Sequence, residues 1–450
     1  MGVLVVIGGV ASAVWMGLLA VSGASLDPKI YRSPRRRLFA AMAGIFLASA
    51  LLYGYPALLG GAPTAAWSGL VILSLVSLVP RRSTVEGDSP PDPRPFDERD
   101  HVLSRMHLAA GSPEEEDYYR RRPDRRGEDE TLRSLPAMGD PATPAYHPGA
   151  ALEVDSLFAV VRRIGVLPSA SPGAADRTPA WVRARAEEVA RGLGAVAVGV
   201  SSLRPGDLYS HAADRRGDYG EEIVTDHTRA IVFAVEMDAD RVEMAPSLQA
   251  TVESASGYLR AAVIGSAVAE VVARAGGDAR LHRSGDYQLV LPPLAARAGL
   301  GEIGMMGLLV TESWGPRIRL GAVTTDIPLA PDSPGSFGLA EFCRRCGKCA
   351  LNCPGRAIAR VPGRSRGTEK WEVDGDACYA FWRRVGSDCG LCLRVCPYGR
   401  AEWPLRNLWR RAVRRRPSLV PLGLAYDDLL YARRPRPLLP GRGSGTFPDG

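Results

Sequence analysis

Eight cysteines are the feature that most constrains this chain of 450 residues. Four of them lie in CRRCGKCALNCP, which runs from Cys343 to Pro354 with the spacing C-x2-C-x2-C-x3-C-P. In this spacing, three thiolates bind one iron–sulfur cubane and the fourth binds a second one. A zinc site pairs its cysteines and closes at four ligands, so it has no use for three evenly spaced cysteines followed by Cys-Pro. The run therefore predicts iron–sulfur clusters.

The other four cysteines form a second, stretched copy of the motif. Three of them read C-x2-C-x3-C-P up to Pro397, and Cys378, eleven residues before Cys389, is the candidate for the missing ligand. The crossover rule then predicts two 4Fe–4S clusters, one on Cys343, Cys346, Cys349 and Cys396, and one on Cys353, Cys378, Cys389 and Cys392. No cysteine remains for a disulfide, which favours a reducing compartment.

Two long segments near the N-terminus carry no charge. Residues 1–26 are long enough to cross about 30 Å of hydrocarbon as a helix, and residues 38–80 are divided by Gly- and Pro-rich turns into two further spans. We expect a three-helix transmembrane anchor over residues 1–82 and a Pro-rich linker over residues 83–95. A cleaved signal peptide is the alternative for the first segment, which lacks a basic start and a clear cleavage site.

Arginines between the spans predict the orientation. The first loop holds five basic residues and Arg81-Arg82 follow the third span, whereas the loop between spans two and three has no charge. The positive-inside rule predicts a multi-pass protein of the inner membrane with its catalytic domain in the cytoplasm. Arg36-Arg37 before an apolar segment resembles a twin-arginine export signal, so an extracytoplasmic location is the alternative. The net charge of +7 owes much to these arginines, and no basic stripe suggests a nucleic-acid partner.

The residues after the linker predict a mixed fold. Residues 96–150 are charged and turn-rich with aromatic anchors, and helices then alternate with valine-rich, buried strands. We expect helices at 181–194 and 248–277, and strands at 195–203, 230–237, 279–283 and 287–291. This alternation indicates an α/β or α+β class, and we take α+β, with a core at 96–335, a ferredoxin-like domain at 336–410 and a C-terminal tail at 411–450.

Five segments resemble corrinoid-dependent reductive dehalogenases: 95–126, 230–238, 250–272, 298–358 and 389–403. The resemblance implies a nitroreductase-like, corrinoid-binding core fused to a two-cluster ferredoxin module. It also implies removal of halide from an organohalide by low-potential cobalt, with electrons from a quinol or a reduced ferredoxin. Many family members rely on a separate anchor protein, whereas this chain is expected to carry its own. Epoxyqueuosine reductase resembles the same core and uses the same cofactors, but it is soluble.

The resemblance also implies catalytic residues. Tyr258, in ESASGYLR, matches the position of the family's catalytic tyrosine, and Ser254 lies one helical turn earlier. A tyrosine in an apolar helix is otherwise a core residue. As a proton donor it would need a nearby arginine to stabilise its anion. Arg317 and Arg319, in GPRIR, are the candidates, and we prefer Arg317.

A glycine motif and the histidines bear on the cofactor. Gly299, Gly301 and Gly304 match G-x-G-x-x-G, but Pro292-Pro293 interrupt the strand that a dinucleotide fold would need. Close approach to a corrinoid or a tight packed turn remain as interpretations. The chain has six histidines but no D-x-H-x-x-G motif, so we expect no histidine ligand on the lower cobalt face, consistent with the base-off binding that the resemblance implies. Two alternatives stay open: a membrane-tethered two-cluster ferredoxin, and a corrinoid-dependent reductase of a non-halogenated substrate.

Overall fold

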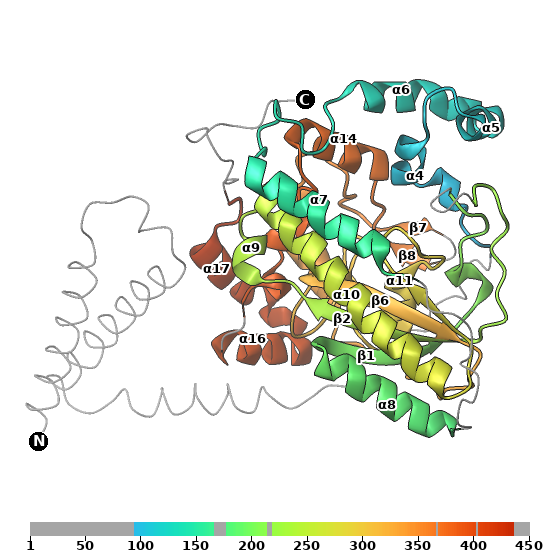
Figure 1. Ribbon diagram of the computed structural model, residues 1–450. Helices are drawn as coiled ribbons and strands as arrows, with labels where there is room; N and C mark the ends of the chain where they lie inside the picture. The colour runs from blue at the N-terminus through green and yellow to red at the C-terminus, as the bar shows by residue number, and fades with distance from the viewer. Residues whose placement is uncertain (1–93, 166–176, 214–217, 366–367, 402–403, 436–450) are drawn as a thin grey trace, which may run out of the picture. The chain divides into compact units, whose positions relative to one another are not determined.

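The computed structural model describes 94–165, 177–213, 218–365, 368–401 and 404–435 (Figure 1). The expected anchor at 1–82, nearly all of the expected linker and the end of the tail lie outside these residues. The chain divides into two compact units, one of Thr84–Arg410 with Arg434–Gly450, and one of Met1–Ser83 with Arg411–Arg433. Each unit is described by itself.

A four-stranded antiparallel sheet forms the centre of the first unit. Its order is β1-β2-β6-β3, with the bounds β1 Ala195–Ser202, β2 Arg229–Glu236, β3 Ala279–His282 and β6 Ile318–Thr325. β1, β2 and β3 were expected. β6 was not expected, although it pairs with both β2 and β3. The antiparallel pairing and the surrounding helices agree with a mixed fold of α+β type.

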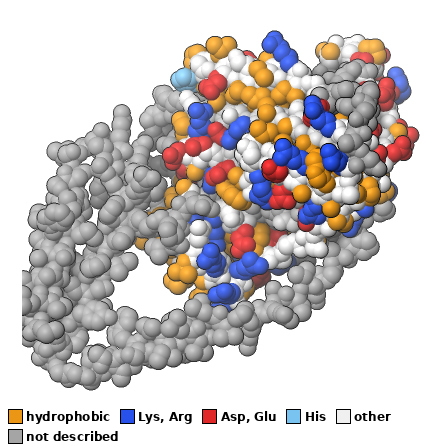
Figure 2. All heavy atoms as spheres, turned by 60° about the horizontal axis from the view of Figure 1, so that its bottom comes forward, with side chains coloured by type: hydrophobic (Ala, Val, Ile, Leu, Met, Phe, Trp, Pro, Cys, Tyr) orange, Lys and Arg blue, Asp and Glu red, His pale blue; other side chains and the backbone are white. Residues whose placement is uncertain are grey.

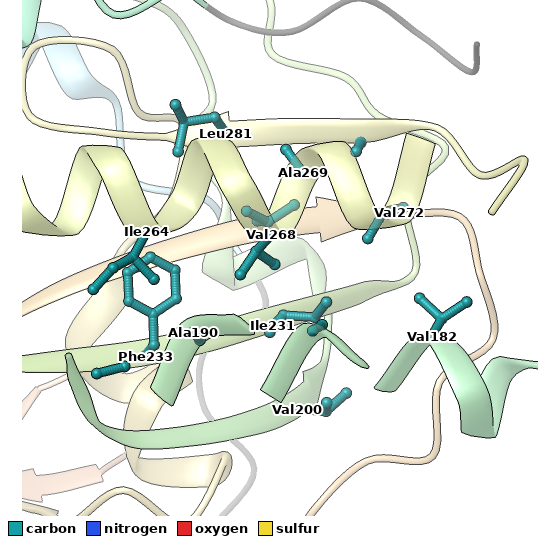
Figure 3. Close-up of a cluster of buried hydrophobic side chains, with 14 of the residues drawn as sticks. Val182, Ala190, Val200, Ile231, Phe233, Ile264, Val268, Ala269, Val272 and Leu281 are labelled. Atoms are coloured by element: carbon teal, nitrogen blue, oxygen red, sulfur yellow. The ribbon is translucent and has the colours of Figure 1, made fainter. Parts of the chain in front are cut away.

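Two helices cover one face of the sheet. α10 (Leu248–Arg274) and α8 (Pro179–Gly192) pack on it through small and branched side chains, and both helices were expected. Figure 3 shows Ile264 and Val268 of α10 and Ala190 of α8 around Phe233 of β2. α7 (Pro148–Arg163) runs along the outer side of α10 (Figure 1).

A shorter layer covers the opposite face. It consists of α11 (Leu291–Arg297) and a small hairpin of β4 (Glu302–Ile303) and β5 (Leu309–Val310), which pack against the inner residues of β2 and β6. The expected strand at 287–291 is wrong. Only Leu289 makes an isolated bridge there, and Pro292 near the start of α11 favours a helix instead.

The segment after the linker is helical and contacts the cysteine-rich region. It holds η2 (Glu98–Asp100), α4 (Val102–His107), α5 (Pro113–Arg121), η3 (Pro123–Arg125) and α6 (Arg126–Ser134). Tyr118 and Tyr119 are buried, as expected for aromatic anchors. Arg105 of α4 pairs with Asp129 at 2.9 Å and also with Asp376 of α14 (Gly375–Val385). The segment therefore wraps part of the cysteine-rich region, and ion pairs hold it there.

Short helices build the cysteine-rich region and the end of the chain. They are α12 (Leu339–Cys346), α13 (Lys348–Leu351), α14, α15 (Leu391–Arg394), η5 (Pro397–Gly399) and α16 (Pro404–Arg415), with the strands β7 (Gly363–Ser365) and β8 (Thr368–Lys370). η4 (Pro205–Asp207) and α9 (Ala239–Val242) complete the first unit. η6 (Pro417–Leu419) and α17 (Val420–Tyr431) belong to the second.

One helix in the described part of the chain is long and apolar enough to cross a membrane. This is α10, and half of its most apolar window is buried inside the protein. Because it packs on the sheet, it is the central core helix. The predicted spans themselves are not among the described residues. On the face drawn in Figure 2, acidic, basic and apolar side chains lie interspersed over the described surface.

Candidate functional site

Four cysteines from two separate parts of the sequence line one pocket. They are Cys343, Cys346, Cys349 and Cys396, and Met305, Phe342 and Lys348 lie in the same wall. Gly347, with a left-handed backbone, ends α12, and α13 begins at the next residue. Cys343 and Cys346 of α12 and Cys349 of α13 therefore lie on two short consecutive helices. The structure thus brings together the set that the crossover rule predicts for the first cluster.

The other four cysteines form a neighbouring group. Cys378 interacts electrostatically with Cys353, and Cys392 interacts with both of them and with Cys389. Cys349 of the first group interacts with Cys392, so the two groups lie next to each other. Cys378 therefore lies where the missing ligand of the second cluster is predicted. Its ligation remains a prediction.

The thiols lie in an environment that suits metal-bound sulfur. Burial raises the pKa of Cys343 to about 12 and that of Cys378 to about 11, because a buried thiolate loses its hydration. Hydrogen bonds point toward the sulfurs: Ala357 N–H donates to Cys353 Sγ at 3.3 Å, and the Trp382 side chain bonds Cys378. Iron would supply the positive charge that such thiolates need, and N–H donors commonly support cluster sulfurs. The donor set therefore fits two 4Fe–4S clusters. In the described ranges, no three His, Cys, Asp or Glu side chains converge on a single metal ion.

Tyr258 lies on α10, half-buried, with an arginine over its ring. The guanidinium carbon of Arg319 is 5.1 Å from the ring centroid, and the ring of Phe158 from α7 is 6.1 Å away on centroids. Arg319 also donates to Ser254 Oγ at 2.6 Å. The structure therefore brings Tyr258 and Ser254 together, as expected, with a cation beside them.

That cation is Arg319 and not Arg317, so the preference for Arg317 is corrected. Arg317 is 1% exposed and donates to the carbonyl oxygens of Met237 and Gly399 and, at 3.0 Å, to Glu236 Oε1. It links the end of β2 to η5, just after Cys396. Sequence could not separate the two arginines, because they sit two residues apart at the start of a strand that was not expected.

Gly257 explains how Arg319 reaches the tyrosine. A Cβ at this position would lie 2.9 Å from Cγ of Arg319, closer than real Cβ atoms come to other heavy atoms. The missing side chain lets the arginine cross α10 one residue before Tyr258.

Asp388 completes the site and was not predicted. Ser254 Oγ donates to Asp388 Oδ2 at 2.7 Å, and Thr251 Oγ1 donates to Asp388 Oδ1 at 2.7 Å. Asp388 directly precedes Cys389, so it joins the tyrosine site to the second cysteine group. An aspartate before a cysteine carries no sequence signal of this role.

The three motif glycines are packed against the protein itself. A Cβ at Gly301 would lie 2.3 Å from the carbonyl oxygen of Val310, and one at Gly304 would lie 2.9 Å from a methyl group of the same valine. Gly299 has φ +79 and directly follows the α11 C-cap residue. This packing accounts for the tight-turn interpretation, and their contact with a corrinoid remains a prediction.

Two buried polar atoms, one on β6 and one just before α10, lack a hydrogen-bond partner among the described residues. They are Arg319 Nε and the hydroxyl oxygen of Ser247, the residue before α10. Groups of this kind suit the amide side groups of a corrinoid, because buried polar atoms are otherwise costly.

Comparison with known proteins decides the relationship. A family described as a 4Fe-4S dicluster domain matches residues 342–400. The tetrachloroethene reductive dehalogenase of Desulfitobacterium hafniense is 35% identical over 204 residues, which cover 43% of this chain and 36% of that protein. Over this stretch the chain is similar to reductive dehalogenases. The resemblance read from the sequence is thereby confirmed, although the chain spans well under half the length of that relative.

Two further similarities concern a solved structure and a related enzyme. A structure titled "Reductive dehalogenase structure suggests a mechanism for B12-dependent dehalogenation" aligns with a TM-score of 0.63 at 23% identity, over 80% of this chain and 50% of that chain. It shows that the fold is shared. Epoxyqueuosine reductase of Lactococcus garvieae is 30% identical over 118 residues, 25% of this chain and 32% of that enzyme.

Proposed function

We propose that this chain is a membrane-anchored oxidoreductase that removes halide from an organohalide. It uses a corrinoid held by the nitroreductase-like core and two 4Fe–4S clusters held by the eight cysteines. The observation that carries the proposal is the pairing of Tyr258 with Arg319 next to the second cysteine group, through Ser254 and Asp388. A pure electron carrier has no need for a tyrosine–arginine pair at that place.

Different residues would carry out the proton-transfer and electron-transfer parts of the reaction. Replacing a carbon-bound halogen by hydrogen takes two electrons and one proton and releases halide. When bound, a corrinoid supplies low-potential cobalt for cleavage of the carbon–halogen bond. Tyr258 holds the proton on its hydroxyl oxygen, and Arg319 stabilises the phenolate that remains. The eight cysteines would hold the clusters that deliver single electrons.

The histidines support base-off binding. All six make contacts with protein groups elsewhere: His101 and His147 cap helices, His107 bonds the carbonyl of Leu103, His211 bonds Ser210, and His227 and His282 bond Thr324. None of these contacts involves Tyr258 or Arg319.

The membrane part of the proposal rests on the sequence. The charge-free segments within residues 1–82 would anchor the protein in the inner membrane, and the flanking arginines favour a catalytic unit in the cytoplasm. An extracytoplasmic unit is the alternative. A quinol in the bilayer or a reduced ferredoxin would serve as the electron donor.

Halide release tests the proposal directly. The full chain, purified without oxygen and loaded with iron, sulfide and cobamide, is incubated with a strong reductant and a panel of organohalides that includes tetrachloroethene. Release of chloride or bromide above a cobamide-only control supports the proposal. Cobamide bound without halide release points to a non-halogenated substrate, and clusters without any cobamide point to a tethered ferredoxin.

A further inference from the structure

Asp388 stands between the two functional parts of the protein. Both of its carboxylate oxygens accept hydrogen bonds from α10, one from Thr251 and one from Ser254. Its backbone N–H also donates to Thr251 Oγ1 at 3.3 Å. Thr251 and Ser254 are buried on one face of α10, so three hydrogen bonds fix this one residue on the core helix.

The next residue shows why such fixing matters. Cys389 has a left-handed backbone with φ 56, a conformation that is strained for residues other than glycine. A conformation of this kind persists only where neighbouring contacts hold it. The hydrogen bonds of Asp388 act one residue before the strained position, at the predicted ligand of the second cluster.

The other end of the same network holds the arginine. Ser254 accepts from Arg319 and donates to Asp388, so its single hydroxyl proton is directed toward the carboxylate. Arg319 Nη2 is 3.9 Å from Asp388 Oδ2, close enough for charge attraction between them. Without the carboxylate, the hydroxyl proton of Ser254 has no fixed direction in these contacts. Arg319 also loses its anionic partner.

We infer that Asp388 is a positioning residue that couples the Cys389 ligand loop to the Tyr258–Arg319 pair. One part of this inference rests on the proposed function: Asp388 orients the arginine that stabilises the phenolate. Independently of that function, it places one negative charge beside the second cluster. An asparagine of the same shape would remove the charge, and its single carbonyl oxygen could accept from only one of the two hydroxyls, that of Thr251 or that of Ser254.

The test compares Asp388→Asn with Asp388→Glu, Thr251→Val and Asp332→Asn in the full, reconstituted chain. Asp332 is the matched control, because it bonds the guanidinium of Arg183 at 2.6 Å and the N–H of Val200 in a different part of the core. The potential of the second cluster is measured by an EPR-monitored titration. The kcat and KM of halide release are measured on the same preparations.

We expect Asp388→Asn to favour the reduced second cluster about tenfold, a shift of about 59 mV for a one-electron couple. We also expect its kcat to fall at least tenfold with KM within threefold. Thr251→Val should lower kcat without that shift, Asp388→Glu should keep the wild-type potential, and Asp332→Asn should change neither quantity. A wild-type potential and kcat in Asp388→Asn would overturn the inference, as would an equal shift in Asp332→Asn.

Two further outcomes are decisive. If Asp388→Asn binds only about four irons while Asp388→Glu binds about eight, the carboxylate is needed to form the second cluster and the inference stands. If the wild-type protein releases no halide but Asp388→Asn still shifts the potential, the proposed function fails while the role of Asp388 at the cluster stands.

Discussion

Replacing Tyr258 with phenylalanine removes one oxygen atom and little else. The ring keeps its place under Arg319, at 5.1 Å, and beside Phe158. A cation–π contact of this kind is worth about 0.5–1 kcal/mol at partly exposed sites and survives the change. We therefore expect the free energy of unfolding to change by less than about 1 kcal/mol.

Loss of the proton donor has a much larger effect on the reaction. A positioned general acid contributes about 10²- to 10⁴-fold, or about 3 to 5 kcal/mol of the activation free energy. The kcat of halide release should fall by this factor, while the iron, sulfide and cobalt contents stay at the wild-type level. The assay is single-substrate halide release by protein loaded with clusters and cobamide.

A matched tyrosine makes the result specific. Tyr287 packs against the ring of Tyr209 at 5.9 Å, away from the site, so Tyr287→Phe should keep wild-type turnover. A Tyr258→Phe protein that binds corrinoid and releases halide at the wild-type rate would refute the assignment of the proton donor.

Three further substitutions test contacts elsewhere in the unit of Thr84–Arg410. Asp129→Ala leaves Arg105 buried with one partner fewer, and urea unfolding should show a loss of about 3 kcal/mol; an unchanged midpoint would contradict the buried pair. Burial opposes ionisation of Asp97, but hydrogen bonds and charge from neighbouring arginines outweigh it and hold its pKa below the usual value of 3.8. Its stabilisation is therefore present above about pH 4 and is lost as the pH falls through the folded-state pKa, so Asp97→Asn should flatten the acid limb of stability against pH. Gly386 has φ +82, and a Cβ there would lie 1.9 Å from Thr143 Oγ1, so Gly386→Ala should cost at least about 1–2 kcal/mol and lower the iron content, whereas wild-type iron content would contradict this.

The sequence predicted the elements that carry long apolar runs. β1, β2 and α10 are nearly continuous runs of small and branched apolar residues, and such runs show in composition alone. β6 was missed because Arg319 and Gly321 interrupt its pattern. Both residues have tertiary reasons for being there: Arg319 reaches Tyr258, and a Cβ at Gly321 would lie 2.6 Å from the ring of Phe233.

The cysteine groups were predictable because spacing limits which thiolates can meet. The arginine and Asp388 were not, because their roles depend on contacts between residues 65 and 134 positions apart. Arg317 and Arg319 differ only in what lies opposite them, the carbonyl of Gly399 for one and the gap left by Gly257 for the other. That difference exists only once the core and the cysteine-rich region are in place.

The most direct test of the account is the metal content of the full chain after anaerobic reconstitution with iron, sulfide and a cobamide. The account predicts about eight irons and eight sulfides per chain, with one cobalt, and two interacting 4Fe–4S signals by EPR. Protein that takes up all of the iron and sulfide but no cobamide would contradict the central claim that the core holds a corrinoid beside the second cluster.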